Sequence, residues 1–425
     1  MDVSEPQASV ARRPGGDAAK RQSSRESGGA GVGGLESAAR TGAATTRFSC
    51  FDGLRAIAAT TVLVTHVSLV SGANTNHSFG AYFARMDVGV TIFFVISGFL
   101  LYRPFVAALL AGAPRPSARA YARRRLLRIF PAYWVALTAA LVLLGGSYEI
   151  DQLVRFYALV HIYTAETVLA PIIQAWSLGT ELSFYVFLPL FAALLARHDP
   201  GTPRGRLRRQ VIGLGALVVV ALAYRLVVLA ADPEPLAMFL MWLPNHLDTF
   251  AIGMGLAVLQ VWRSQHQATA PNPLDRRWAP ALCWGGAAAA FWAVATQVGL
   301  PVASLTYTDG QVLWRHLLYT ATAALLLLPA IFGPQEQGII RRLLRLRVVA
   351  LVGLVSYGVY LWQITVLEEY LDRTGTAAFT GSFLPILTWV FAITVLVAAV
   401  SYAVVERPAL ALKQRRRRPV PELVG

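Results

Sequence analysis

The stretch that decides the fold class lies near the end of the chain, where residues 383–405 read FLPILTWVFAITVLVAAVSYAVV without a charged side chain. A helix that crosses a bilayer needs about 20 mostly apolar residues. Similar stretches precede this one at 53–72, 87–110, 129–146, 174–196, 211–231, 236–262, 280–300, 312–332 and 348–367. The sequence therefore predicts an all-α, polytopic membrane protein with about ten transmembrane helices.

The overall composition agrees with this prediction. Of 425 residues, 56% are hydrophobic and 14% are charged, and the mean hydropathy is +0.52. Such a chain is too apolar for one soluble domain. The two ends differ: residues 1–48 are rich in Gly, Ala, Ser and Arg, and 409–425 contain a run of arginines. We expect a disordered basic N-terminal tail, a membrane domain over 49–408, and a basic C-terminal tail that meets anionic headgroups.

The net charge of +15 would suggest nucleic acid in a soluble protein, but here the basic residues follow a topological pattern. Lys and Arg gather in 1–50, 103–128, 197–209, 263–277, 341–347 and 407–418, whereas the loops between these segments carry acids instead, such as Glu149, Asp151, Asp232 and Asp309. By the positive-inside rule, both termini are cytoplasmic, which requires an even number of helices. We expect a multi-pass protein of the cell membrane whose partner is the lipid bilayer, and no nucleic acid.

The first predicted helix carries two ionisable groups, Arg55 and His66, eleven residues apart. This spacing places them within about 20° of one face and about 16 Å apart along the axis. Ionisable groups inside a membrane are candidates for functional sites, and imidazole is a good general base near neutral pH. The alternatives are that Arg55 is a positive-inside anchor and that His66 packs between helices.

The fourth and sixth predicted helices carry further polar groups. Glu181 lies about two turns from the outer end of its helix, at a depth similar to that of His66. A buried carboxylate needs a partner, so Glu181 either orients the imidazole or pairs with an arginine. His246 and Asp248 face different ways on a helix, so we do not expect them to act as one unit. A structural role is favoured for His246, and both roles stay open for Asp248.

The loop YARRRLLRIFPAYW (121–134) places four arginines before the third predicted helix: Arg123, Arg124, Arg125 and Arg128. Guanidinium groups bind phosphates with two parallel hydrogen bonds. A phosphate-bearing donor such as acyl-CoA could dock here. Topology signalling and contact with lipid headgroups are the alternative, and spacing alone does not decide between them.

Seven motifs, taken in order over residues 51–408, resemble the acyltransferase type 3 family of integral membrane proteins. They are Asp52-Gly53-Leu54-Arg55 with His66, GVTIFFVISGFLL (89–101), RRRLLRIFPAYW (123–134), Trp176-Ser177-Leu178 with Glu181, Leu247-Asp248 with Gly253, VSYGVYLWQ (355–363) and VVERP (404–408). Each motif alone is weak, but seven in the right order are specific.

The resemblance implies transfer of an acyl group, often acetyl, from cytoplasmic acyl-CoA to a hydroxyl of a sugar, glycolipid, cell-wall polymer or secondary metabolite. By matching position, Arg55 and His66 would be the catalytic pair, with Glu181 as the acid of the fourth helix. The four arginines of 121–134 would bind the donor, and we assign Asp248 and Trp176 to substrate binding. No metal and no permanently bound cofactor are predicted, and acyl-CoA is a donor substrate.

Two positions depart from the family pattern: Thr91 replaces a usual acid, and Gln363 replaces a frequent histidine. The chain ends soon after the last predicted helix, so we do not expect the extracytoplasmic hydrolase-like domain that some members carry. The protein would then acylate its acceptor directly or rely on a separate extracytoplasmic transferase. The main rival is a transporter or flippase that uses His66 and Glu181 as a proton relay. A structural membrane protein without activity is the third alternative.

Overall fold

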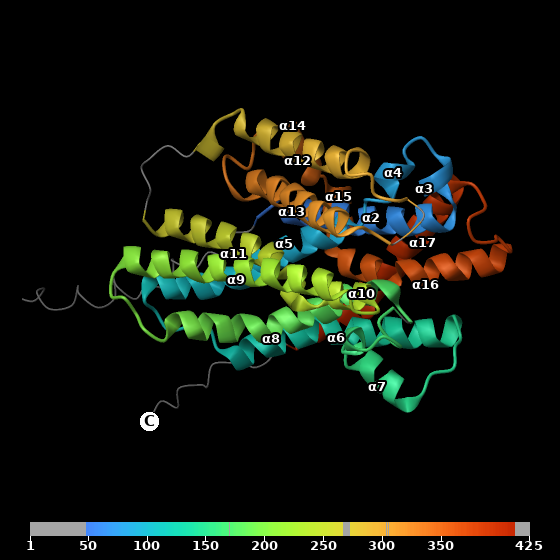
Figure 1. The fold of residues 1–425 in the computed structure, drawn as a ribbon, viewed down its shortest axis with the longest axis horizontal. Helices are drawn as coiled ribbons and strands as arrows, with labels where there is room; N and C mark the ends of the chain where they lie inside the picture. Colours follow the sequence, from blue (N-terminus) through green and yellow to red (C-terminus); the bar gives the residue numbers. More distant parts are fainter. Residues whose placement is uncertain (1–47, 170, 267–272, 303, 305, 413–425) are drawn as a thin grey trace, which may run out of the picture. The chain divides into compact units, whose positions relative to one another are not determined.

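The computed structural model describes residues 48–169, 171–266, 273–302, 304 and 306–412, and Figure 1 shows their course. The predicted N-terminal tail, apart from Phe48, and the arginine run of the predicted C-terminal tail lie outside the described residues. Within the described part, all regular secondary structure is helical. This confirms the all-α class.

The main α-helices are α2 (Phe51–Val70), α5 (Val88–Ala111), α6 (Ala118–Leu143), α8 (Trp176–Ala196), α9 (Pro203–Ala231), α11 (Leu243–Gln265), α12 (Ala279–Thr296), α13 (Asp309–Ile331), α16 (Ser356–Thr374) and α17 (Phe383–Ser401). Shorter helices are α3 (Ala73–Asn76), α4 (Gly80–Phe83), α7 (Ile150–Tyr157), α10 (Leu236–Met241), α14 (Ile339–Leu344), α15 (Arg347–Leu354) and α18 (Arg407–Ala411). Three single 3₁₀ turns lie at His161–Tyr163, Ile173–Ala175 and Pro273–Asp275, and a π-helical turn, Tyr402–Glu406, joins α17 to α18.

Eight of the described helical segments are long and apolar enough to cross a membrane, or nine if the bent pair α15 and α16 is one span. The protein is therefore a polytopic membrane protein, and ten is an approximate count. The difference lies partly in the sixth predicted stretch, which breaks at Trp242 into α10 and α11. Polar Asn245, His246 and Asp248 lower the hydropathy of the first turns of α11, so it is not among the eight.

Glycines allow the central helices to approach closely. A Cβ at Gly98 of α5 would overlap the Phe250 carbonyl, and one at Gly253 of α11 would overlap the Val95 carbonyl. Gly89 meets the Ala58 carbonyl of α2 in the same way. Small residues at such crossings are the usual device of membrane bundles. Gly89 and Gly98 thus permit close contact of α5 with α2 and α11.

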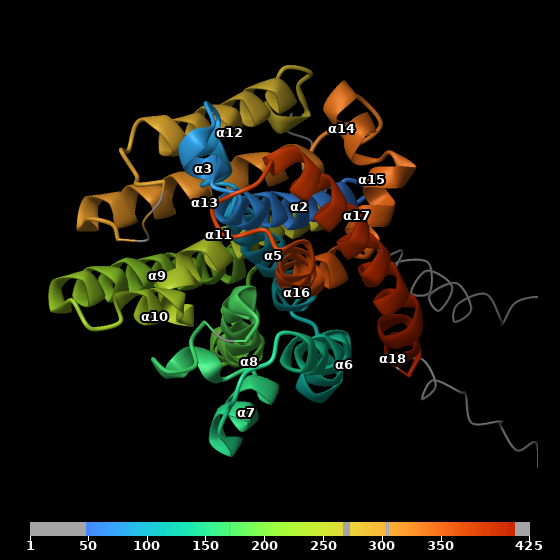
Figure 2. The same cartoon turned by 90° about the vertical axis from the view of Figure 1, so that its right-hand side faces the viewer.

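In Figure 2, α2, α5 and α16 run through the middle of the bundle, with α6 and α8 on one side and α12 and α13 on the other. The first turn of α2 lies directly against α14 and α15. A Cβ at Gly53 would overlap the Leu344 carbonyl of α14. A Cβ at Gly353 would likewise overlap the Asp52 carbonyl. These two contacts set the position of the turn that carries Arg55.

The prediction that a loop carries the arginine cluster is wrong, because α6 begins at Ala118 and includes Arg123 and Arg128. Ser117 caps the helix by accepting a hydrogen bond from the Ala120 amide at 3.4 Å. Arginine and leucine are good helix formers, so the amphipathic segment extends the apolar span on its N-terminal side. The arginine side chains therefore extend from fixed positions on a helix.

Candidate active site

A cavity of about 190 Å³ lies between α2, α5, α6, α8 and α16. Its charged lining residues are Arg55, Arg125, Arg128 and Glu181. Hydroxyl groups provide most of the remaining polar lining, from Ser97, Ser177, Tyr185, Ser356, Tyr357 and Tyr360. With three arginines and one carboxylate, the lining favours an anionic ligand.

Arg55 and Glu181 reach this cavity from different helices. Arg55 Nη1 lies 3.3 Å from Asp52 Oδ1, one turn earlier on α2. The Glu181 carboxylate accepts a hydrogen bond from the Ser97 hydroxyl of α5. Glu181 also interacts electrostatically with Arg55. The structure thus brings together two of the three predicted catalytic residues and adds Ser97, whose hydroxyl holds the carboxylate.

The four predicted donor-binding arginines divide into two groups. Arg125 and Arg128 line the cavity, and the Arg125 guanidinium lies 5.9 Å from the centre of the Tyr185 ring. Arg123 is exposed and donates to the Leu412 carbonyl at 3.1 Å, beside α18. Arg124 is not a lining residue. Helix periodicity explains the division, because consecutive residues on α6 point in different directions.

His66, the third predicted catalytic residue, is half-buried further along α2 and is not a lining residue. Its Nδ1 lies 3.4 Å from Oε1 of buried Gln363 on α16. The Gln363 Nε2 donates to the Tyr360 carbonyl at 3.1 Å. A carbonyl oxygen only accepts, so the amide nitrogen of Gln363 must face Tyr360 and its oxygen must face His66. This network assigns the proton to Nδ1 and the lone pair to Nε2.

A direct contact between Glu181 and His66, one of the two alternatives for Glu181, is not among the hydrogen bonds of the described residues. Ser97 is the hydrogen-bond partner of Glu181, and Gln363 is that of His66. Similar depth on two helices does not decide which way each side chain points. His66 is instead linked to the cavity along α16, since Tyr360, one turn before Gln363, is a lining residue.

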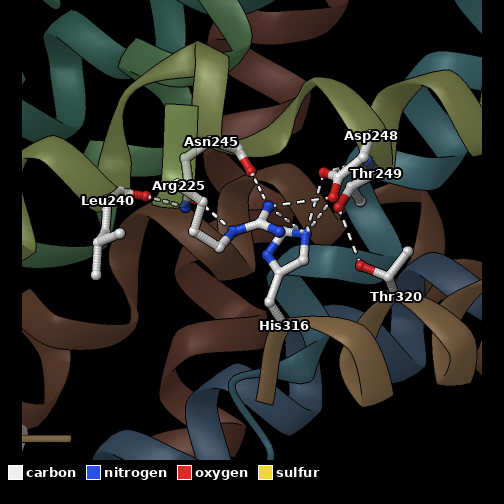
Figure 3. Close-up of polar contacts among 7 residues, drawn as sticks. All are labelled: Arg225, Leu240, Asn245, Asp248, Thr249, His316 and Thr320. Atoms are coloured by element: carbon white, nitrogen blue, oxygen red, sulfur yellow. Dashed lines mark hydrogen bonds and ion pairs between the residues drawn. The ribbon is translucent and has the colours of Figure 1, made fainter. Parts of the chain in front are cut away.

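Asp248, predicted to bind substrate, lies in a second polar cluster between α9, α11 and α13 (Figure 3). Its Oδ2 is 3.1 Å from Arg225 Nη2 and 2.9 Å from His316 Nε2. Arg225, which is 4% exposed, also donates to Asn245 Oδ1 at 2.8 Å. These contacts favour the structural alternative for Asp248, because its carboxylate already has two partners, buried Arg225 and partly buried His316.

Trp176 lies next to the cavity, behind one of its apolar walls. Its ring centre is 6.2 Å from that of Phe94, which lines the cavity, and 5.8 Å from that of His246. His246 and Asp248 share a neighbour in His316, whose ring centre is 6.0 Å from that of His246 and whose Nε2 is 2.9 Å from Asp248 Oδ2. Substrate binding by Trp176 stays a prediction, and Trp176 would influence a bound substrate through its contact with Phe94.

Comparison of the sequence with known proteins identifies the family to which the chain belongs. The acyltransferase type 3 model, described as an acyltransferase domain, matches residues 48–406. The chain belongs to this family. Because the match covers every helix that lines the cavity, the candidate active site lies within the acyltransferase type 3 domain.

Three relatives illustrate the family. A candidate membrane-bound transacylase, BcsY of Komagataeibacter xylinus, is 30% identical over 41% of this chain and 42% of its own length. Nodulation protein 10 of Rhizobium leguminosarum bv. viciae is 30% identical over 40% of this chain and 50% of its own. A candidate peptidoglycan O-acetyltransferase, YrhL of Bacillus subtilis, is 24% identical over 84% of this chain and 54% of its own. The chain spans about half the length of these relatives, and no solved structure matches it.

Three lining residues of this acyltransferase type 3 site were missed from sequence, Ser97, Tyr357 and Tyr360, as was His316 of the separate Asp248 cluster. For Ser97, the position beside Gly98 on a polar-poor helix was a usable signal. In the motif VSYGVYLWQ, Tyr357, Tyr360 and Gln363 recur every three residues, which places them near one face of α16. That periodicity could have predicted a polar stripe. No local signal predicted His316, because its partner Asp248 is distant in sequence.

Proposed function

We propose that the protein is an integral membrane acyltransferase that transfers an acyl group from acyl-CoA to a hydroxyl of its acceptor. The observation that carries this proposal is the arginine-lined cavity at the start of α2, the helix that also holds His66. Guanidinium groups suit the phosphates of a CoA donor. About 16 Å of helix separates Arg55 from His66, which suits a donor with a long arm between its phosphates and its thioester.

In the proposed reaction, the His66 Nε2 lone pair takes the proton of the acceptor hydroxyl, and the oxygen attacks the thioester carbonyl carbon. The carbon–sulfur bond then breaks, and the CoA sulfur leaves with the proton that His66 carries. Gln363 holds Nδ1–H throughout, so that Nε2 stays the basic atom. Arg125 and Arg128 hold donor phosphates, and Arg55 orients the donor or stabilises developing negative charge. Glu181 balances the arginine charge.

The acyl group that we propose is acetyl or another short chain, and the acceptor is a sugar, glycolipid, cell-wall component or secondary metabolite. The name of the Bacillus relative, which describes an O-acetyltransferase acting on peptidoglycan, supports this class. Comparing product masses in cells with and without the protein would identify the acceptor.

We also propose that both termini are cytoplasmic. Reporter fusions after residues 150, 234 and 309 should then lie outside, and fusions after 117, 205, 270 and 340 inside. A cytoplasmic signal at 309 would contradict this topology.

The decisive experiment measures CoA release by membranes that contain matched amounts of wild type, His66→Ala and His66→Gln. Loss of a general base typically costs about a hundredfold to ten-thousandfold in rate, and glutamine fills the space without supplying a comparable base. Both variants should therefore be impaired to that extent. Near-full turnover of His66→Gln would make His66 a packing residue. A transporter would release no CoA even as wild type.

A further inference from the structure

A second cavity, of about 200 Å³, lies where α5 and α8 end and α9 begins. Its charged lining residues are Arg115, Arg206, Arg209 and Asp199, and Leu109 and Leu195 contribute apolar walls. It lies at the end of the bundle that carries the basic segments 103–128 and 197–209. The proposed reaction uses none of the residues that line this second cavity.

One of the three arginines is matched by the aspartate. Arg206 Nε lies 2.8 Å from Asp199 Oδ1, and its Nη2 lies 2.6 Å from Oδ2. These bonds, and one from the Gly201 amide at 3.0 Å, lower the pKa of Asp199 to about 2. Asp199 is therefore ionised at neutral pH and balances Arg206, while Arg115 and Arg209 are left as excess positive charge in the cavity.

Arg209 has an unmet donor. Its Nη1 is buried and has no hydrogen-bond partner among the described residues. A buried donor without an acceptor costs free energy, more so when it is charged. The buried nitrogen and the excess charge both call for an anionic acceptor from outside the chain.

The backbone around the cavity is shaped to hold these groups. Gly112 ends α5 with a left-handed φ of +65°, and a Cβ there would lie 2.6 Å from Arg206 Nη2. Arg206 Nη1 also donates to the Leu110 carbonyl at 3.4 Å. Gln210 is 2% exposed and accepts a hydrogen bond from the Tyr102 hydroxyl. The end of α5 and the start of α9 are therefore tied together on two sides of the cavity.

We propose that this cavity binds a phosphate group, and that its source is the headgroup of an anionic phospholipid. Exposed apolar side chains lie within five positions of lining residues along the chain: Leu190 and Leu194 on α8 are 65% and 54% exposed, and Val211 and Ile212 on α9 are 60% and 59% exposed. Arginines close to exposed apolar side chains match the charged headgroup and the apolar tails of a phospholipid at the membrane boundary. The phosphates of a free nucleotide share the headgroup chemistry but would not use the apolar side chains.

The test is native mass spectrometry of the full chain in detergent with phosphatidylglycerol or phosphatidylcholine. Wild type should retain the anionic lipid in preference to the zwitterionic one, whose choline would meet the arginines. Arg209→Gln should weaken phosphatidylglycerol binding about tenfold, because it removes charged hydrogen bonds to the phosphate. Arg208→Gln is the matched control, since Arg208 is exposed, lies next to Arg209 and is not a lining residue.

Equal binding by Arg209→Gln and Arg208→Gln would overturn the site. If Arg209→Gln does not fold, exposed Arg115→Gln replaces it, with a smaller expected loss in the same direction. A competition arm adds CoA or inorganic phosphate. If CoA displaces phosphatidylglycerol from wild type at micromolar concentration, a soluble phosphate ester is the source and the lipid assignment is overturned. If neither soluble anion displaces it, the lipid assignment stands. These readouts are independent of acyl transfer.

Discussion

Two acidic side chains of the bundle, Glu181 and Asp248, both lie near arginine but in different surroundings. Asp248 is enclosed by Arg225 and His316, at 3.1 and 2.9 Å. Glu181 faces a cavity of about 190 Å³ together with Arg55, Arg125 and Arg128. Charges that satisfy one another stabilise a particular packing of helices, whereas charges that face open space are available to a ligand. Both acids have arginine nearby, and the difference lies in whether protein side chains or a cavity fill the space around the carboxylate.

The largest effect should come from removing one charge from each region with an isosteric change. Asp248→Asn leaves Arg225 buried without its counter-charge, which typically costs about 3–5 kcal/mol. The variant should lose most of its folded protein, as measured by thermal unfolding in detergent. Glu181→Gln should unfold at nearly the wild-type temperature but release CoA more slowly. Equal destabilisation of the two variants would remove the distinction between the regions.

The next effect concerns the division of the arginines of α6. Arg125→Gln or Arg128→Gln should raise the apparent KM for acyl-CoA about tenfold or more while kcat changes little. The lost contacts would bind the donor equally well in the ground state and in the transition state. Arg123→Gln is the control, since its guanidinium contacts the Leu412 carbonyl instead. The measurement is CoA release as a function of donor concentration. An equal rise in KM for Arg123→Gln would mean that general positive charge, and not the cavity, binds the donor.

A third polar group, a buried histidine with no carboxylate partner among the described residues, extends this comparison to a group that is neutral when folded. His161, which lies outside the membrane spans, is 1% exposed, and burial lowers its pKa to about 4. The unfolded chain therefore takes up a proton on this group near pH 6.5, before the folded chain does, so stability falls as the pH drops. Between pH 7 and pH 5 the loss should be about 2 kcal/mol. His161→Phe should lose less stability over the same range in thermal unfolding scans. Identical acid sensitivity of the two proteins would contradict this assignment.

The smallest effect should come from Gln363, which touches His66 and not the cavity. Gln363→Leu removes the acceptor that holds Nδ1–H, and loss of one hydrogen bond should lower turnover about five- to tenfold. Gln363→His, the residue frequent in the family, should restore an acceptor and part of the rate. In a His66→Gln background, Gln363→Leu should change nothing further, because the two residues act as one unit. An additive loss there would give Gln363 a role separate from His66.

Much of the fold could be predicted because membrane spans are long and locally encoded. Each of the ten predicted stretches overlaps a helix, and the motif glycines sit where helices cross. The start of α6 could not be predicted from hydropathy, since its first turns are basic yet helical. The break of the sixth stretch at Trp242 depends on where Asn245 and Asp248 find their partners, and those partners lie on other helices.

The candidate site was predictable in its residue types and less so in its pairing. Arg55, His66 and Glu181 were named from helix spacing and depth, and the arginines of α6 from their clustering and the affinity of guanidinium groups for phosphates. Their partners, however, come from residues far apart in sequence: Ser97 for Glu181 and Gln363 for His66. One sequence gives depth along the membrane normal but not the rotation of each helix about its axis. That rotation decides which of two groups at equal depth meet.

The bend of 71° between α15 and α16 falls at the cavity, where Ser356 and Tyr357 are lining residues. The first turn of a helix leaves backbone N–H groups without intrahelical acceptors, and the aligned peptide dipoles give that end about half a positive charge. Interrupted membrane helices use such ends to hold anionic groups. The cavity therefore has a source of positive potential that no side-chain substitution removes, so replacement of any single arginine should weaken donor binding without abolishing it.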